Sequence, residues 1–149
     1  FVERLAERAS RLVLGDGRAA GTDVGPLIHE ASRENVERYV AIGREEGATL
    51  VLGGERPSDA ATAHGCFYRP TIFTGVRPGS RLEQEEIFGP VLSVIRVADA
   101  DEAFRVNNGV RYGLSSSLYT ANVSLAFRAL NELDNGITYV NAPTIGAEA

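Results

Sequence analysis

Residues 90–97, PVLSVIRV, are the most apolar run of the chain and give the strongest indication of its fold. A short, nearly continuous apolar run of this kind is typical of a strand buried on both faces of a sheet. Just beyond it, Asp99 and Glu102 have the spacing of a capping box, which predicts a helix that runs to about Asn108. A buried strand followed directly by a helix is the first half of a strand–helix–strand unit.

The sequence beyond this helix repeats the alternation. LSSSLYT at 114–120 and ITYVN at 137–141 are predicted strands, and the stretch between them, from about 122 to 133, has apolar residues at helical spacing. Alternating strands and helices predict parallel pairing with right-handed crossovers, so the predicted fold class is α/β. Because ligands of open parallel sheets bind beyond the carboxyl ends of the strands, the loops 98–101 and 142–149 form the expected functional rim.

The first half of the chain predicts a less regular set of elements. Amphipathic spacing indicates two helices, a β-branched run indicates a strand, and turn-rich sequence at 54–66 indicates an exposed loop at the tip of a hairpin. The predicted segments are a helix from Phe1 to about Leu12, a helix from about Glu30 to Glu46, a strand at 49–54 and an extended pair at 67–68 and 71–74.

Composition is that of an ordinary globular domain. The 149 residues are 44% apolar and 23% charged, which is one domain's length of chain with enough apolar material to fold. The formal net charge of −5 argues against a nucleic acid or an anionic membrane as partner. No apolar run approaches the ~18 residues that a membrane-spanning helix needs.

The first residue of the chain and its single cysteine concern the origin of the sequence and the cellular compartment of the protein. The chain begins at Phe1 and contains no methionine, so we expect an excerpt of a longer product. Residues 1–14 carry too many charges for a secretory signal. The single Cys66 cannot form an internal disulfide, which favours a reducing compartment and a cytoplasmic location.

Most motifs that carry chemistry are absent from the sequence. His29, His64 and Cys66 lack the spacing of metal ligands, so no metal site is expected. Cys66 lies in HGCFYRP, where His64 could lower the thiol pKa, but a spectator thiol is the expected role. NVS at 122–124 matches a glycosylation sequon by chance, since nothing indicates secretion.

The segment EEIFGP at 85–90 is the strongest candidate site. Its two carboxylates lead into Ile-Phe-Gly-Pro, which places Glu86 at the edge of the core, where a carboxylate needs hydrogen bonds. A carboxylate next to Phe88 suits a nucleoside, because ribose hydroxyls can donate to the acid while a ring packs on the phenyl group. An acidic cluster followed by a core phenylalanine explains the same residues. The residues alone leave both interpretations open.

A series of motifs along the chain resembles the aldehyde dehydrogenase superfamily. In the family's order they are TDVGPLI at 22–28, GATLVLGG at 47–54, FYRPTIF at 67–73, EEIFGPV at 85–91, NNGVRYGLSSSLYT at 107–120 and GITYVNAPT at 136–144. The opening residues 1–14 resemble the helix that follows the family's catalytic cysteine segment. The resemblance implies that residues 1–149 form part of the catalytic domain, a parallel-sheet lobe with helices on both faces, truncated at both ends.

This resemblance also implies an activity and two site residues. The family oxidises an aldehyde to a carboxylic acid, or an acyl derivative, with NAD or NADP. A cysteine thiolate attacks the carbonyl, hydride passes to the nicotinamide, and a glutamate base activates the water that releases the acid. Glu86 matches the acid that holds the nicotinamide ribose, and Phe88 matches the aromatic beside the nicotinamide ring. These two are the predicted cofactor-binding residues.

Several functional parts of the family have no counterpart in this sequence. The nucleophile lies just upstream of the position matching Phe1, and the base, the oxyanion-hole asparagine and the dinucleotide-binding domain belong to the N-terminal part. No catalytic residue is therefore expected in this chain, and the fragment alone should be inactive. The sequence stops before the family's Pro-Phe-Gly-Gly segment and final oligomerisation strand. Ser32 stands where many relatives carry a glutamine on the nicotinamide side, so that secondary contact is not carried over.

Two hypotheses about the whole protein follow. In the first, the full-length protein acts on a small-molecule aldehyde as a homodimer or homotetramer. In the second, it is a non-catalytic member of the same fold with a structural or oligomerisation role. A Gly-Gln-x-Cys-like segment and an upstream base in the complete gene would support the first hypothesis.

Overall fold

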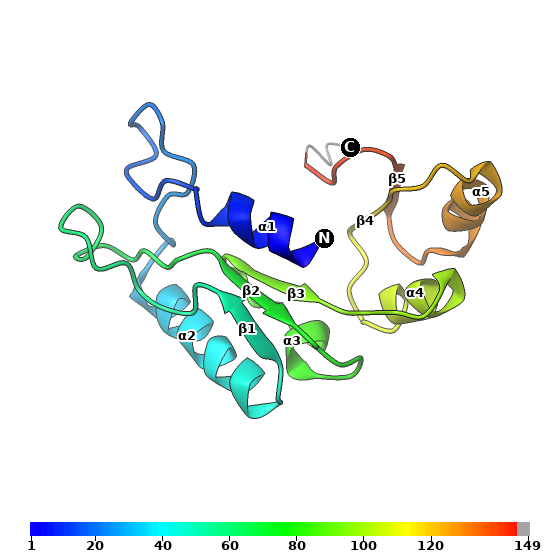
Figure 1. Cartoon of the computed structure of the whole chain (residues 1–149), viewed down its shortest axis with the longest axis horizontal. Coiled ribbons are helices and arrows are strands. Elements are labelled where there is room, and N and C mark those ends of the chain that lie inside the picture. The colour runs from blue at the N-terminus through cyan, green and yellow to red at the C-terminus, as the bar shows by residue number, and fades with distance from the viewer. Residues whose placement is uncertain (146–149) are drawn as a thin grey trace. The chain divides into compact units, whose positions relative to one another are not determined.

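The computed structural model describes residues 1–145, and the chain divides into two compact units, Phe1–Arg96 and Val97–Ala149 (Figure 1). Each unit has its own small sheet and is described by itself. The predicted α/β class is confirmed in both, because each unit contains a parallel strand pair together with helices.

The sheet of the first unit has the strand order β1-β2-β3 among the described residues. Its strands are β1 (Thr49–Leu52), β2 (Thr71–Thr74) and β3 (Val91–Val94). The pair β1 and β2 is antiparallel, which confirms the predicted hairpin, and β2 and β3 are parallel. Of the predicted extended pair, 71–74 forms β2, and 67–68 lies before the strand begins at Thr71.

Helices lie on both faces of this sheet, as Figure 1 shows. They are α1 (Val2–Ala9), α2 (Glu30–Glu45) and the single-turn α3 (Arg81–Gln84). The core forms where Val36, Tyr39 and Val40 of α2 pack with Phe73 of β2 and Leu82 of α3. The helix α2 ends as predicted, because Gly47 takes a positive φ of 83° just beyond it.

The opposite face of the sheet is covered only loosely by α1. This helix has no buried residue, and an apolar groove lined by Leu5, Ala9, Ile72 and Leu92 lies between it and the sheet. The prediction of a strand buried on both faces is therefore wrong for β3, since Leu92 is exposed and its strand neighbours are only half-buried.

The second unit is a strand–helix–strand unit preceded by a helix. Its elements are α4 (Ala100–Asn107), β4 (Ser115–Leu118), α5 (Val123–Glu132) and β5 (Ile137–Val140). The strands β4 and β5 pair in parallel from Ser115 opposite Ile137 to Leu118 opposite Val140. One continuous sheet is not formed, because in residues 1–145 these strands pair only with each other.

The cap predicted at Asp99, at the start of the helix α4, is confirmed. The Asp99 side chain accepts a hydrogen bond from the Glu102 amide at 2.8 Å and begins α4. The Glu102 carboxylate returns to the Ala98 amide at 2.7 Å, one residue earlier than in the usual capping box. Asn122 caps α5 in the same way, by accepting from the Ser124 and Leu125 amides.

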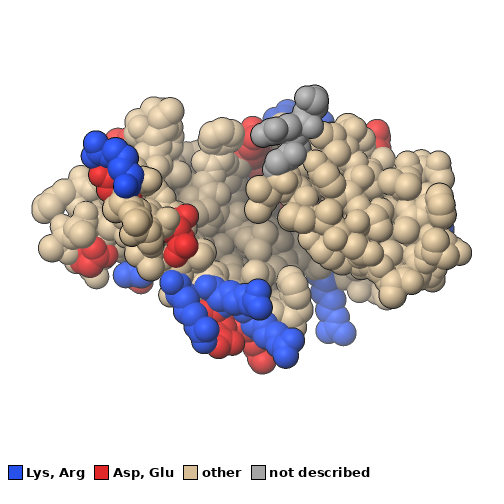
Figure 2. Space-filling model, turned by 90° about the horizontal axis from the view of Figure 1, so that it is seen from above, with Lys and Arg blue, Asp and Glu red and all other residues tan. Residues whose placement is uncertain are grey.

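The apolar stripe of α5 is largely exposed. Val123, Phe127 and Leu130 are 68%, 63% and 53% exposed, and Ala129 is the only residue of the helix that is buried. Figure 2 shows a broad face over the second unit with hardly any charged side chain. Of the predicted functional rim, residues 98–101 form the start of α4, and 146–149 lie outside the described residues. Within residues 1–145 no helix is long and apolar enough to cross a membrane.

Candidate active-site segment

The turn that leads from α3 into β3 carries the EEIFGP motif and is anchored first at Glu85. The Glu85 carboxylate accepts a hydrogen bond of 2.6 Å from the Tyr39 hydroxyl and bonds of 3.1 Å from both Nε and Nη2 of Arg81. The Arg81 guanidinium, followed by the Tyr39 hydroxyl, lowers the pKa of Glu85 to about 2. The carboxylate is therefore ionised at neutral pH and ties the turn to α2 and α3.

The second anchor is a side-chain amide from the middle of α2. Asn35 donates from Nδ2 to the carbonyl oxygen of Ile87 at 2.9 Å. The Asn35 Oδ1 accepts from Arg38 one helical turn later at 2.6 Å, which fixes the direction of the amide group. Ile87 itself packs its side chain against the core.

Beyond Ile87 the backbone is pressed against α2. A Cβ on Gly89 would come within 2.3 Å of Cγ2 of the fully buried Val36, so only glycine fits without a shift of the neighbours. Pro90 then begins the strand, and its carbonyl accepts from the Thr71 amide at 2.8 Å. The turn is thus held at Glu85, Ile87, Gly89 and Pro90.

The residues between these anchors point outward. Glu86 is exposed, and Phe88 is 79% exposed with a φ of 55°, in the left-handed region that bulky residues rarely adopt. A bulky residue in this backbone region carries strain, and such strain occurs mainly at functional sites. The arrangement presents one carboxylate and one aromatic ring to solvent from a fixed turn.

The structure corrects two details of the sequence-based expectation. Among residues 1–145, Glu86 accepts no hydrogen bond at the edge of the core; the carboxylate that does so is its neighbour Glu85. The interpretation of Phe88 as a core residue is wrong, since the ring is exposed. Sequence reasoning missed Asn35, Tyr39 and Arg81. Of these three, only Tyr39 could have been found from the sequence, because a tyrosine on the apolar face of a helix needs a hydrogen-bond partner for its hydroxyl group.

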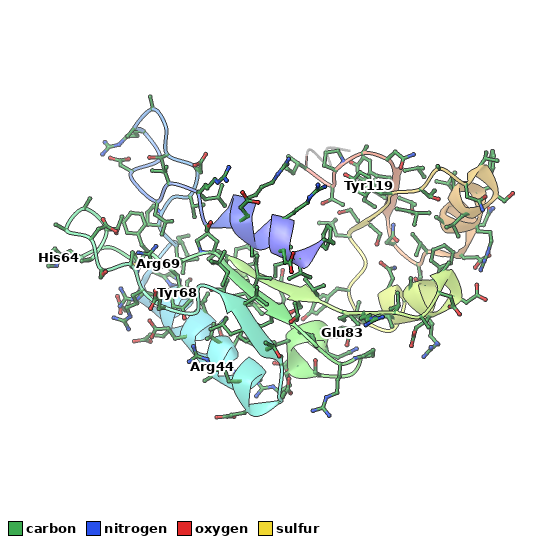
Figure 3. The ribbon with its side chains drawn as sticks, viewed as in Figure 1. Arg44, His64, Tyr68, Arg69, Glu83 and Tyr119 are labelled. Carbon is green, nitrogen blue, oxygen red and sulfur yellow. The ribbon has the colours of Figure 1, made fainter. Side chains whose placement is uncertain are left out.

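Among the described residues, no hydrogen bond joins Cys66, His64 or Ser32 to this turn. The Cys66 Sγ lies 4.0 Å from the Glu30 carboxylate, which already forms an ion pair with an arginine of α2. Figure 3 shows His64 at the tip of the loop between β1 and β2. Ser32 shares the start of α2 with His29, whose Nδ1 is 3.1 Å from the Ser32 amide and 2.9 Å from its hydroxyl. The described residues contain no group of three or more His, Cys, Asp or Glu that could hold a metal ion.

Comparison with known proteins identifies relatives that are named as aldehyde dehydrogenases. The profile of the aldehyde dehydrogenase family matches residues 1–149. The α-ketoglutarate semialdehyde dehydrogenase of Haloferax volcanii is 43% identical over 99% of this chain and 30% of its own length. The betaine aldehyde dehydrogenase of Bacillus subtilis is 40% identical over 95% of this chain and 29% of its own length.

Solved structures agree with the sequence relatives. Betaine aldehyde dehydrogenase from Staphylococcus aureus, crystallised with NAD+, matches with a TM-score of 0.90 at 32% identity, over 95% of this chain and 29% of that one. HpcC from Thermus thermophilus matches with a TM-score of 0.90 at 39% identity, over 95% of this chain and 28% of that one. The chain spans less than a third of the length of these relatives. A profile match along all 149 residues shows that the chain belongs to the aldehyde dehydrogenase family.

Proposed function

We propose that these residues form part of an NAD(P)-dependent aldehyde dehydrogenase, in which Glu86 and Phe88 hold the nicotinamide end of the cofactor. The observation that carries the proposal is the outward presentation of both side chains from a turn anchored at Glu85 and Ile87. A relative of similar structure was crystallised with NAD+, which supports the choice of cofactor.

The exposed groups of the turn suit a dinucleotide. The Glu86 carboxylate can accept hydrogen bonds from both hydroxyls of a ribose, and the Phe88 ring offers a flat apolar face on which a nicotinamide ring can pack. Both side chains are exposed, so neither has to leave the protein core in order to bind. When bound, the dinucleotide supplies a two-electron hydride acceptor.

The role of this chain is then to position and not to break bonds. Glu86 fixes the ribose, and Phe88 limits the tilt of the ring and keeps water from one of its faces. Hydride transfer depends steeply on the distance and angle between donor and acceptor, so this positioning controls the rate. The residues that attack the carbonyl and activate water are proposed to lie in the part of the family's sequence that these 149 residues do not contain. On this proposal the chain alone is inactive.

The substrate is proposed to be a small aldehyde. Relatives are named for betaine aldehyde and α-ketoglutarate semialdehyde, which differ in charge. The dinucleotide-binding domain and the oligomerisation strand are proposed to lie outside residues 1–149, and the complete protein to be a cytoplasmic homodimer or homotetramer. The single Cys66 supports a reducing compartment. Light scattering on the complete protein measures its oligomeric state.

The proposal is tested in the complete protein, expressed with whatever sequence its gene places on either side of these residues. Glu86→Gln is compared with Glu45→Gln, which neutralises an exposed carboxylate on α2. With betaine aldehyde, α-ketoglutarate semialdehyde and hexanal as probes, NADH formation in a single turnover is followed at 340 nm. Glu86→Gln should slow hydride transfer by about tenfold without loss of folding, because the ribose loses the charge and one of the two acceptor oxygens of the carboxylate.

Two results contradict this proposal. Unchanged single-turnover rates in Glu86→Gln would exclude the cofactor role of this carboxylate. Absence of NADH or NADPH formation by the folded wild-type protein with every probe would favour the non-catalytic alternative.

A further inference from the structure

We propose that Asn35 is a positioning residue for this site: through its hydrogen bond to the Ile87 carbonyl, it sets the directions in which Glu86 and Phe88 leave the turn. The inference deepens the proposed function and rests on it. Asn35 lies 52 residues before Ile87 in the sequence and belongs to another element, α2.

The bond is placed where it has the greatest effect on the two exposed side chains. Ile87 stands between Glu86 and Phe88, and the direction of its carbonyl is fixed by the peptide plane that it shares with Phe88. Holding the carbonyl at 2.9 Å from the Asn35 Nδ2 therefore restrains the φ of Phe88, which is 55°. A bulky residue keeps such a conformation only when its surroundings impose it.

The other contacts of the turn explain why Asn35 decides its conformation. Glu85 is held by Tyr39 and Arg81, and Gly89 is held by its close approach to Val36. These contacts act at the two ends of the turn, and none of them binds the central peptide. Among the described residues, the side-chain hydrogen bond to that peptide comes from Asn35.

The amide is itself oriented by a charged neighbour. Arg38 donates to the Asn35 Oδ1 at 2.6 Å, so the NH2 group of the amide faces Ile87. The Arg38 guanidinium carbon also lies 4.6 Å from the centre of the Tyr39 ring, whose hydroxyl holds Glu85. One face of α2 thus carries the side chains that hold both Glu85 and Ile87.

The test uses the complete protein with Asn35→Asp, which keeps the size of the side chain but replaces the donor with an oxygen beside the Ile87 carbonyl. Asn131→Asp is the matched control, because Asn131 also donates from Nδ2 to a backbone carbonyl, that of Phe127, on α5. The readouts are hydrogen exchange of a peptide covering residues 85–90 without cofactor, NAD+ affinity by calorimetry without aldehyde, melting temperature, and single-turnover hydride transfer.

Asn35→Asp should accelerate exchange at 85–90, and should raise the NAD+ dissociation constant and slow hydride transfer by about tenfold each. The melting temperature and the KM for the aldehyde should stay at the control's values, which a general loss of structure would not allow. If Asn35→Asp does not fold, Arg38→Met tests the same step, because it removes an exposed side chain that orients the amide.

The outcomes separate this inference from the proposed function. If Glu86→Gln and Phe88→Leu weaken NAD+ binding while Asn35→Asp leaves exchange and affinity unchanged, the positioning role is wrong and the proposed function stands. If none of the three variants changes NAD+ affinity, the proposed function fails as well. Unchanged exchange and affinity in Arg38→Met would overturn the role given to the oriented amide.

Discussion

Glu85 is the residue of the 85–90 turn whose charge is coupled to folding. Its pKa is lowered from 4.5 to about 2 by the Arg81 guanidinium and then by the Tyr39 hydroxyl. A lowered pKa in the folded state means that the stabilising contribution is complete above the unfolded-state value. The contribution is then lost as the pH falls from 4.5 through about 2.

This coupling predicts the behaviour of Glu85→Gln in urea unfolding at a series of pH values. The difference in free energy of unfolding between wild type and variant should be constant above pH about 5 and shrink below it. Tyr39→Phe, which removes one donor, should reduce the pH dependence without abolishing it. A difference that stays constant down to pH about 3 would contradict the assigned role of Glu85.

Gly89 is the residue at which the turn passes closest to the core. Gly89→Ala should lower the free energy of unfolding by about 1–3 kcal/mol, because the new methyl group would overlap Val36 at the centre of the core. Gly25→Ala is the control, since a Cβ there meets nothing within 4 Å. That variant should be neutral or gain up to about 1 kcal/mol through a restricted unfolded state. Equal stability of the two variants in urea would show that the turn is not held against α2.

How far the site could be predicted is clearest at these residues. The sequence alone draws attention to the motif EEIFGP, because a pair of carboxylates, an aromatic, a glycine and a proline in sequence is unusual in itself. The hydrogen bond that selects Glu85 over Glu86 comes from Tyr39, 46 residues away in the sequence. No local sequence pattern contains that information. The exposure of Phe88 likewise follows from its φ, which only the folded turn reveals.

The predicted helices agree with the structure more closely than the strands do. Capping side chains, apolar spacing and terminal glycines are local signals, and they predicted α2, α4 and α5 to within a few residues. Strand burial is not local, because it depends on what covers each face. Of the eight residues of PVLSVIRV, only 91–94 form the strand β3. Leu92 is exposed because α1 covers its face of the sheet poorly.

The cap of α5 allows a test at the scale of one element. Asn122→Ala should cost about 1 kcal/mol, because the Ser124 and Leu125 amides at the start of the helix lose their acceptor. Asn131→Ala on the same helix should be near neutral, since its bond to the Phe127 carbonyl lies on an exposed surface and alanine favours the helix. Both are measured as shifts in the urea midpoint of unfolding. A larger loss in Asn131→Ala than in Asn122→Ala would contradict the capping role.

At the scale of the whole molecule, the exposed apolar residues predict how the 149-residue chain behaves alone. The stripe Val123, Phe127 and Leu130 on α5 is largely exposed. Figure 2 shows a broad face over the second unit with hardly any charged side chain. Monomers rarely leave apolar patches of more than a few hundred Å2 uncovered. The longer relatives have two thirds or more of their sequence outside this match, which offers material to cover such a face.

The isolated chain should therefore bind a hydrophobic dye strongly and associate with itself as its concentration rises. Burying a phenylalanine contributes about 1.5–3 kcal/mol, so Phe127→Gln should raise the dissociation constant for association by about ten- to hundredfold and weaken dye fluorescence. Ser124→Gln, at an exposed position of the same helix, should change neither. Light scattering and dye titration over a concentration series make the measurement. A soluble monomer that melts sharply and binds little dye would show that the chain is stable without further sequence to cover this face.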